Sequence, residues 1–342
     1  MRHTIFFVFF VSFVSSCKND INLNNQKDYS NLIDINDQSY VVDTTYQKGD
    51  IRRYGIYPNQ SFSNKTWNQV LLLASKGMPI TFQKGIYHGN FIFSGLDNIT
   101  MHFKDATLAG GIQIINNENK GSKNINLLGK LTVLDKVFIK QSQSIKFDNL
   151  SIVSDTIHNI YQKQNRGLSI YAGSKKINID TLKIIDTGGS SDSFYKYSAS
   201  ALQVHGYNNN PEDLNIGYLY IKNAERTALY LTGNNHHIKK IDIDNFGFGS
   251  NSNMFGLEDA KPKSQEVFAG AWFNKCNDCT VDTLVINAQP NSKIFSAKFG
   301  LGVYSKPCII NNIQFNKHAQ QMPIEDDLLT NVLVKRVLND YY

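Results

Sequence analysis

The clearest pattern along the chain is a short apolar phrase. An aliphatic or aromatic residue is followed three positions later by an aliphatic one, and then by another apolar residue after a single position. The phrase occurs at residues 147–152, 179–184, 216–221, 238–243, 281–286 and 310–315, with looser copies at 128–133 and 103–108. Successive copies start 19 to 43 residues apart. Since the shortest interval is about one coil of a parallel β-solenoid, we predict a solenoid whose longer coils carry insertions.

A second strand is predicted a few residues upstream of most copies, at 137–140, 167–171, 201–205, 228–232, 270–274 and 300–304. Side chains of a strand alternate, so the apolar Leu202 and Val204 point inward and their neighbours point outward. The outward residues are expected to form one surface, made of Ser169, Tyr171, Gln203, His205, Tyr230, Thr232, Trp272 and Asn274.

Long insertions flank these upstream strands. Four of them precede a strand, at 154–166, 186–200, 244–268 and 287–298, and a shorter one at 206–213 follows His205 on the other side. Loops on both sides of an exposed sheet form walls, and function tends to lie in such loops on a rigid scaffold. We therefore predict a groove whose floor is the outward surface.

The first 17 residues are typical of an export signal, with a short polar start and an apolar run too short to span a bilayer. The segment ends in Val14-Ser15-Ser16-Cys17, which resembles the lipobox of bacterial lipoproteins, where the cysteine is acylated. An ordinary secretory signal with an incidental cysteine is the alternative. Residues 18–45 are rich in Asn, Asp, Gln and Ser and suit a flexible tether. The folded domain is then expected over 46–342.

Both ends of the domain carry capping signals. A Tyr-Gly segment at 49–55, an amphipathic helix at 63–76 with Trp67 on its apolar face, and a strand and turn at 79–87 stand before the coils. This order resembles the N-terminal cap of the pectate-lyase superfamily. The resemblance implies an all-β, right-handed, single-stranded parallel β-helix with an N-terminal helical cap over about 49–90. In the C-terminal segment, 316–342, apolar residues of 324–338 at helical spacing predict a helix that seals the other end.

Charge and cysteine content narrow the partners. The formal charge of +6 permits an anionic partner, but no basic cluster interleaved with aromatic residues suggests nucleic acid. We expect a monomer. Besides Cys17 there are three cysteines, of which Cys279 and Cys308 occupy the same position of successive coils. Stacked core cysteines are favoured over a metal site for Cys276-x-x-Cys279, because no second pair completes it; a Cys279–Cys308 disulfide is left open.

The predicted floor is suited to a polysaccharide or oligosaccharide. Aromatic faces pack on pyranose rings while amides, imidazoles and cations bind hydroxyl or carboxylate groups. The substrate-binding candidates are Arg166, Tyr171, Gln203, Trp272, Asn274 and Lys275. The alternative is that these aromatic residues merely stack on one another along the sheet.

A lyase is the preferred enzyme, because the outward positions contain no Asp or Glu. β-Elimination of a uronic-acid polymer needs a base and a positive charge against the substrate carboxylate. We assign these roles to His205 and Arg226, with Lys275 as a second cation and Tyr230 as base or proton donor. No cofactor is predicted. Calcium-dependent lyases of the family bind the metal with clustered Asp and Glu side chains on this surface, and the predicted floor has none.

Two other functions are left open. A glycoside hydrolase of the same fold needs two carboxyl groups, for which the candidates are Glu225 and the loop residues Asp192, Glu258 and Asp259. The polygalacturonase motifs of the superfamily are missing, apart from Val204-His205-Gly206. A non-catalytic glycan-binding or adhesive surface protein would use the same floor. In each case we expect a lipid-anchored protein of a bacterial outer membrane, facing the cell surface or the periplasm.

Overall fold

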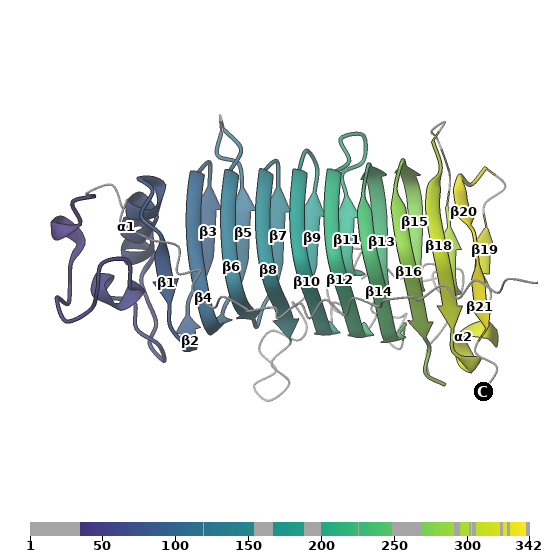
Figure 1. Cartoon of the computed structure of the whole chain (residues 1–342), viewed down its shortest axis with the longest axis horizontal. Coiled ribbons are helices and arrows are strands. Elements are labelled where there is room, and N and C mark those ends of the chain that lie inside the picture. The colour runs from purple at the N-terminus through teal and green to yellow at the C-terminus, as the bar shows by residue number, and fades with distance from the viewer. Residues whose placement is uncertain are drawn as a thin grey trace, which may run out of the picture. The chain divides into compact units, whose positions relative to one another are not determined.

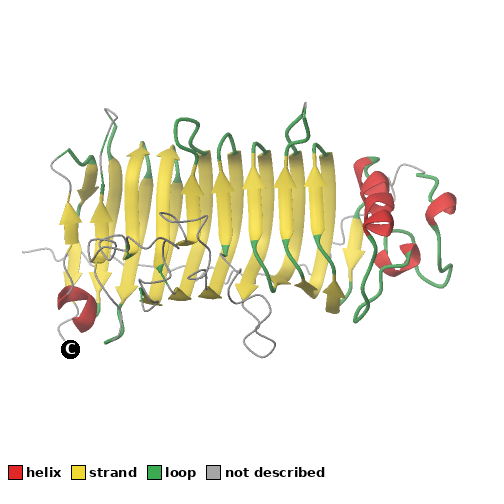
Figure 2. Ribbon diagram, turned by 180° about the vertical axis from the view of Figure 1, so that it is seen from behind, coloured by secondary structure: helices red, strands yellow, loops and turns green. Residues whose placement is uncertain are grey.

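The computed structural model describes residues 35–118, 120–153, 167–187, 200–224, 226–247, 268–290, 295–300, 302, 306–321, 324–326 and 329–339. They belong to one compact unit, Asp34–Tyr342. The described strands form one continuous hydrogen-bonded sheet in which the pairings are parallel, so the protein is an all-β parallel β-helix (Figures 1 and 2). Within these residues, no helix has the length and apolar character needed to cross a membrane.

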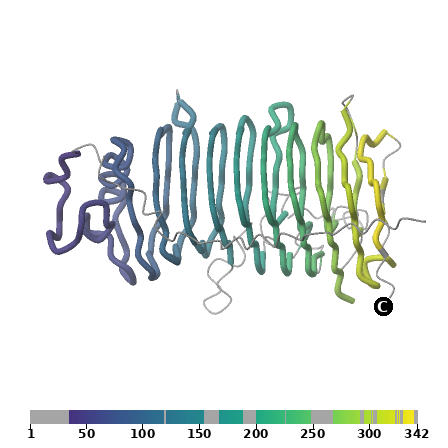
Figure 3. The backbone as a smooth tube through the Cα atoms, in the orientation of Figure 1, coloured from purple at the N-terminus to yellow at the C-terminus, as the bar shows by residue number. Residues whose placement is uncertain are grey.

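Each central coil contains two strands in succession, and Figure 3 shows the coils one beside the next. The first strand is the shorter one in every such coil but one, where the two are nearly equal in length, so we call the first the short strand and the second the long strand. The short strands are β3 (Phe91–Ser94), β5 (Ile112–Ile115), β7 (Val137–Lys140), β9 (Leu168–Tyr171), β11 (Ser200–His205), β13 (Thr227–Asn234), β15 (Ala269–Asn277) and β17 (Phe295–Phe299). The long strands are β4 (Asp97–Ala109), β6 (Lys123–Val133), β8 (Gln143–Val153), β10 (Lys175–Thr187), β12 (Glu212–Ala224), β14 (His237–Phe246), β16 (Thr280–Asn287) and β18 (Cys308–Phe315). We call their outward sides the short-strand face and the long-strand face.

The repeated apolar phrase forms the inward side of the long strands. Its first residues are paired from coil to coil in one column, which comprises Phe147, Ile179, Ile216, Ile238, Val281 and Ile310. The looser copy at 128–133 is out of register, because Leu127 rather than Leu128 pairs with Phe147. Gly129, with φ of 85°, lies within the shift of register and adds the extra residue.

Helix α1 (Asn64–Ser75) lies against β4, and the two short strands that follow it, β1 (Ile80–Phe82) and β2 (Gly85–His88), pair with β4. Together they cover the coil of β3 and β4. The Ser63 side chain caps α1 by accepting a hydrogen bond from the Thr66 amide at 3.0 Å. Trp67 is buried and stacks on Phe91 with 4.4 Å between ring centroids. The predicted capping helix is confirmed, and it shields the apolar end of the solenoid from water.

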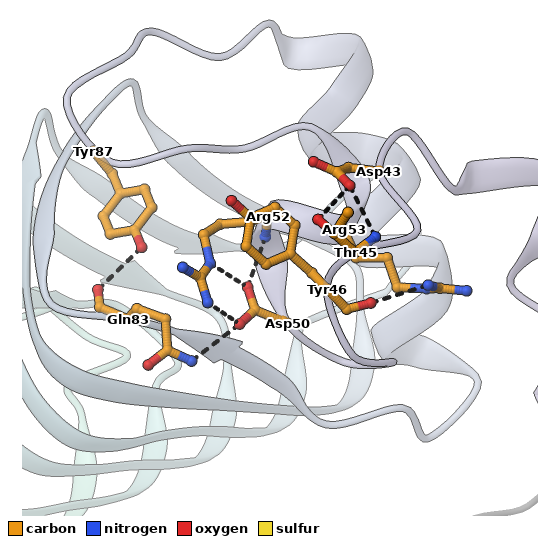
Figure 4. Close-up of polar contacts among 8 residues, drawn as sticks. All are labelled: Asp43, Thr45, Tyr46, Asp50, Arg52, Arg53, Gln83 and Tyr87. Atoms are coloured by element: carbon orange, nitrogen blue, oxygen red, sulfur yellow. Dashed lines mark hydrogen bonds and ion pairs between the residues drawn. The ribbon is translucent and has the colours of Figure 1, made fainter.

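The segment before α1 is held by ion pairs and contains two 3₁₀ turns, η2 (Gln38–Tyr40) and η3 (Ile51–Tyr54). Figure 4 shows Asp50 at its centre: Arg52 donates to both carboxylate oxygens, at 2.9 and 2.7 Å, and Gln83 donates at 3.1 Å. Burial alone would raise the pKa of Asp50, but these hydrogen bonds outweigh it and lower the pKa. The cluster ties the cap to the turn that follows β1 and has a structural role.

The C-terminal helix predicted over 324–338 is wrong. This segment contains β19 (Ile324–Asp326), β20 (Val332–Val334) and β21 (Val337–Asn339), and a short helix, α2 (Lys317–Gln321), precedes it. β19 pairs with β17, while β20 and β21 pair with β18. The segment forms strands and not a helix because its valines favour extended backbone and because β18 provides hydrogen-bond partners along its edge.

The three described cysteines are buried, free thiols. Cys279 and Cys308 follow each other in one inward column, as predicted, because the next residues pair as Thr280 with Ile309. Cys276 donates its S–H to the Leu231 carbonyl at 3.0 Å, and burial raises the pKa of its thiol. These residues pack the core of the last coils.

Candidate functional site

Aromatic rings follow one another across the short-strand face. Successive ring centroids are 6.3 Å apart for Phe138 and Tyr171, 5.9 Å for Tyr171 and His205, 5.6 Å for His205 and Tyr230, and 4.8 Å for Tyr230 and Trp272. Backbone register brings them together, since His205 pairs with Tyr171, and Tyr230 pairs with Trp272. We call these five residues the aromatic row. Gln203, paired with Ser169 and Tyr230, lies beside it.

His205 lies in the middle of the aromatic row and is enclosed by three tyrosines. Tyr171 and Tyr230 approach it along the row, and Tyr207 approaches from the following turn with 4.6 Å between centroids. Burial, and to a smaller extent the charge of Lys275, lowers the pKa of His205 below its ordinary value of 6.5. Among the residues that the structure describes, its buried Nδ1 atom has no hydrogen-bond partner. His205 is thus a neutral imidazole at neutral pH, and its Nδ1 atom is an unsatisfied buried polar group among the described residues.

Tyr230 lies one coil beyond His205, and its hydroxyl is oriented by Asn274. The Asn274 Nδ2 atom donates to the Tyr230 Oη atom at 2.9 Å, which leaves the phenolic proton for another acceptor. Burial raises the pKa of Tyr230 above its ordinary value of 10.0, although the hydrogen bond from Asn274 opposes this. The phenol is therefore protonated at neutral pH and can act as a donor.

The cation that acts on His205 is Lys275. It follows Asn274 in an irregular part of β15, where the pairing with β13 shifts register and Lys275 takes a φ of 52°. Its charge contributes to the lowered pKa of His205. A bulge of this kind re-aims a side chain next to the strand end.

Arg226, which the sequence grouped with His205, lies at the opposite end of the short strands. Ser200 pairs with Thr227, so Arg226 stands one residue before this pair and His205 five residues after Ser200. At roughly 3.3 Å per residue, about 20 Å of strand separates the two positions. Arg226 is also buried, at 3% exposure, and its carbonyl accepts from the Gly247 amide. Placing Arg226 beside His205 is corrected here: sequence proximity to β13 did not tell at which end of the strand it lies.

The turn at 206–211 is anchored beside the candidate site by Asn210. The Asn210 Oδ1 atom accepts from the Gly206 amide at 3.0 Å and from the Thr232 hydroxyl at 3.1 Å. Thr232 is buried by this arrangement rather than presented to a ligand. The turn exposes Tyr207, which the sequence assigned only to a loop, and its position close to a histidine in the chain is the signal that could have found it.

Lys298 is a second residue that the sequence missed. β17 occupies Phe295–Phe299, just before the strand predicted at 300–304, and most of that predicted strand lies outside the described residues. Lys298 of β17 pairs with Trp272. The Lys298 Nζ atom lies 4.7 Å from the Trp272 ring centroid and extends the aromatic row by one coil.

Several predicted residues fall outside the described residues, namely Cys17, Arg166, Asp192, Glu225, Glu258 and Asp259. The same holds for most of the predicted wall insertions, although the described strands on either side place three of them at one corner, before β9, β11 and β15. Within the described part of the chain, no group of three or more His, Cys, Asp or Glu side chains is arranged to hold a metal ion.

A scan against protein-family models gave no match, and searches of curated proteins and of solved structures found no similar protein. The parallel β-helix is established by the backbone register itself.

Proposed function

We propose that this protein is a polysaccharide lyase of the pectate-lyase superfamily that cleaves an anionic, uronic-acid-containing chain by β-elimination. One observation supports this most: a neutral His205 stands in an aromatic row beside a protonated tyrosine and a lysine. Proton abstraction, proton donation and charge neutralisation are the three tasks of such a reaction.

Substrate binding is assigned to the accessible part of the aromatic row. Tyr171 and Trp272 are half-buried and Tyr207 is exposed, so sugar rings stack on them on either side of His205. Coils are about 4.8 Å apart, so the row provides several successive contacts for an extended chain.

The reaction runs from His205 to Tyr230. The neutral imidazole takes the proton on the carbon next to the uronate carboxylate, while the Lys275 ammonium neutralises the charge that builds up there. That electron pair forms the carbon–carbon double bond as the glycosidic C–O bond breaks. The Tyr230 hydroxyl gives its proton to the leaving oxygen. The products are an unsaturated uronate and a new sugar end, so atoms and electrons balance without a redox partner.

Hydrolysis is less favoured because it needs paired carboxyl groups. The outward positions of β9, β11, β13 and β15 hold no Asp or Glu. The next carboxylate-bearing position is Glu325 of β19, which pairs with Lys298 by backbone register and is far from His205. The lipobox-like segment before Cys17 supports export and lipid anchoring, which is where a polymer too large to cross a membrane would be met.

The test incubates residues 35–342 with a panel of uronic-acid and neutral polysaccharides. Ultraviolet absorbance of unsaturated uronates and the number of reducing ends are followed together. We expect both to rise with a uronate polymer. Reducing ends without absorbance would replace the lyase by a hydrolase, and binding without either signal would leave a glycan-binding protein.

A further inference from the structure

The two ends of the solenoid differ in how their apolar interior is covered. α1, β1 and β2 cover the coil of β3 and β4, whereas the last coil, formed by β19, β20 and β21, exposes large apolar side chains, namely Ile324, Leu329, Leu333, Val337 and Leu338. Two of these continue inward columns, since Ile324 pairs with Ala297 and Val337 pairs with Ile313. Ala297 and Ile313 are at most 1% exposed, but Ile324 is 48% and Val337 58% exposed. The interior of the solenoid thus reaches the surface at this end.

Among the described residues, no strand pairs with the side of β20 that points away from β18. Asn331 and Lys335 bond to β18, through the Asn331 carbonyl to Cys308 and the Lys335 amide to Ile310. Backbone groups of a strand alternate in direction, so those of Val332 and Val334 point away from β18. The Val332 amide makes only a local hydrogen bond, to the Thr330 hydroxyl at 3.2 Å. Val334 therefore offers its amide and carbonyl to another strand, and such edges are templates for pairing.

We propose that this C-terminal end binds the same end of a second copy of the chain, in a two-fold dimer whose axis crosses β20. Antiparallel pairing of the two β20 strands bonds Val334 of each copy to Val332 of the other. The exposed apolar residues of this end, Val337 and Ile324 among them, are then covered by the last coil of the other copy, which removes apolar surface from water. This inference is independent of the proposed reaction and replaces the expectation of a monomer.

The charges at this end favour a second copy over an unrelated partner. Exposed Lys335 and Arg336 form the corner after β20, while exposed Asp326 ends β19 and stands at the corner before it. An axis across β20 exchanges these two corners. Asp326 of each copy thereby faces the basic pair of the other copy, so the surface is complementary to itself in charge as well as in apolar character.

The test measures the mass of residues 35–342 by size-exclusion chromatography with light scattering over a range of concentrations. We expect a mass of two chains that falls toward one on dilution. Val337→Asp and Val334→Pro should each give one chain at every concentration. The first places a charge in the interface, and the second removes the free-edge amide while leaving the bonds to β18 intact. Leu72→Asp is the control, since Leu72 is 51% exposed on α1 at the other end.

A cross-link tests the position of the axis. Leu333 lies between Val332 and Val334, so the two Leu333 residues face each other as a non-hydrogen-bonded antiparallel pair, with Cα atoms roughly 4.5 Å apart. Leu333→Cys should form an intermolecular disulfide under mild oxidation, whereas Val42→Cys, also exposed but at the other end, should not. One chain at all concentrations in the unsubstituted protein, or a dimer that survives both Val337→Asp and Val334→Pro, would overturn the proposal.

Discussion

The long-strand face and the short-strand face belong to the same coils but treat their outward side chains in opposite ways. Along the long strands, charged side chains form solvated ion pairs, as in Lys175 and Glu212, whose Nζ and Oε2 atoms are 2.8 Å apart and whose side chains are 45% and 36% exposed. On the short-strand face, Gln203 and Lys298 are only 3% and 6% exposed. Burying polar groups costs free energy and is not needed to stack coils. We infer that the buried polar side chains of the short-strand face have a role beyond stabilising the solenoid.

The largest expected effect is on the rate of the proposed reaction, and it is tested by removing one histidine from each face. His205→Ala should reduce lyase activity about 10²- to 10⁴-fold, because it removes the base. His237→Ala is the matched control, since His237 is exposed at the start of β14 on the long-strand face. Initial rates by ultraviolet absorbance measure both. Equal rates for the two variants would remove His205 from the mechanism.

A proton-donor role for Tyr230 can be tested against its neighbour. Tyr230→Phe should lower the rate about 10²-fold, because the ring stays in the aromatic row but the donated proton is lost. Tyr207→Phe keeps the exposed ring beside His205 and should change the rate little. If the two variants behave in the opposite way, the hydroxyl of Tyr207 is the donor.

The pH dependence follows from the lowered pKa of His205. The reaction uses neutral imidazole, so the rate should fall about tenfold per pH unit on the acid side, with a midpoint below 6.5. Stability changes in the same direction: the unfolded histidine binds a proton more readily, so stability is lost as the pH falls from 6.5 through the folded-state pKa. His205→Gln should abolish that part of the loss, measured by urea unfolding at several pH values. A midpoint above 6.5 would contradict the assignment of the base.

A smaller effect is expected on binding alone. Trp272→Ala should weaken oligosaccharide binding about tenfold, equivalent to roughly 1.4 kcal/mol, by removing a stacking surface. Tyr220→Ala removes a half-buried ring from the long-strand face and should leave affinity unchanged. Isothermal titration compares the two, and similar losses would show that the bound sugar does not follow the aromatic row.

The smallest effect is expected where the long-strand face is fully solvated. Lys130→Ala breaks an ion pair of 2.6 Å with Asp105, but the two side chains are 61% and 44% exposed. Its loss should cost less than about 1 kcal/mol in urea unfolding and nothing in activity. A loss of several kcal/mol would mean that this face, too, carries more than solvated charge.

Much of the architecture could be predicted because inward columns repeat in the sequence. The phrase that starts at Phe147, Ile179 and Ile216 has the same register in the structure. The register fails where a single residue is added, at Gly129, since a bulge leaves no mark in an apolar pattern. It fails again at β17, where Ala297 and Phe299 are buried but are separated by Lys298, which the sequence placed at the end of an insertion.

The candidate site was only partly predictable. Alternation in the strands was enough to bring His205, Tyr230 and Trp272 to one face. It could not tell that Arg226 lies at the far end of the strand, because the sequence does not show where along a strand a neighbouring coil begins. Nor could it show that Tyr207 folds back onto His205, which depends on the hydrogen bonds of Asn210.

The corner that precedes each long strand has a consequence for how this chain can change in length. One residue there has positive φ in coil after coil, at Asn98, Asn124, Ser144, Lys176, Asp213, Asn235 and Asp278. Each coil thus makes its own bend and pairs only with its two neighbours. A gene segment that encodes one whole coil could be duplicated or lost without disturbing the bends of the others. The fold can lengthen or shorten its short-strand face in steps of one coil, while point changes alter the side chains that each coil presents there.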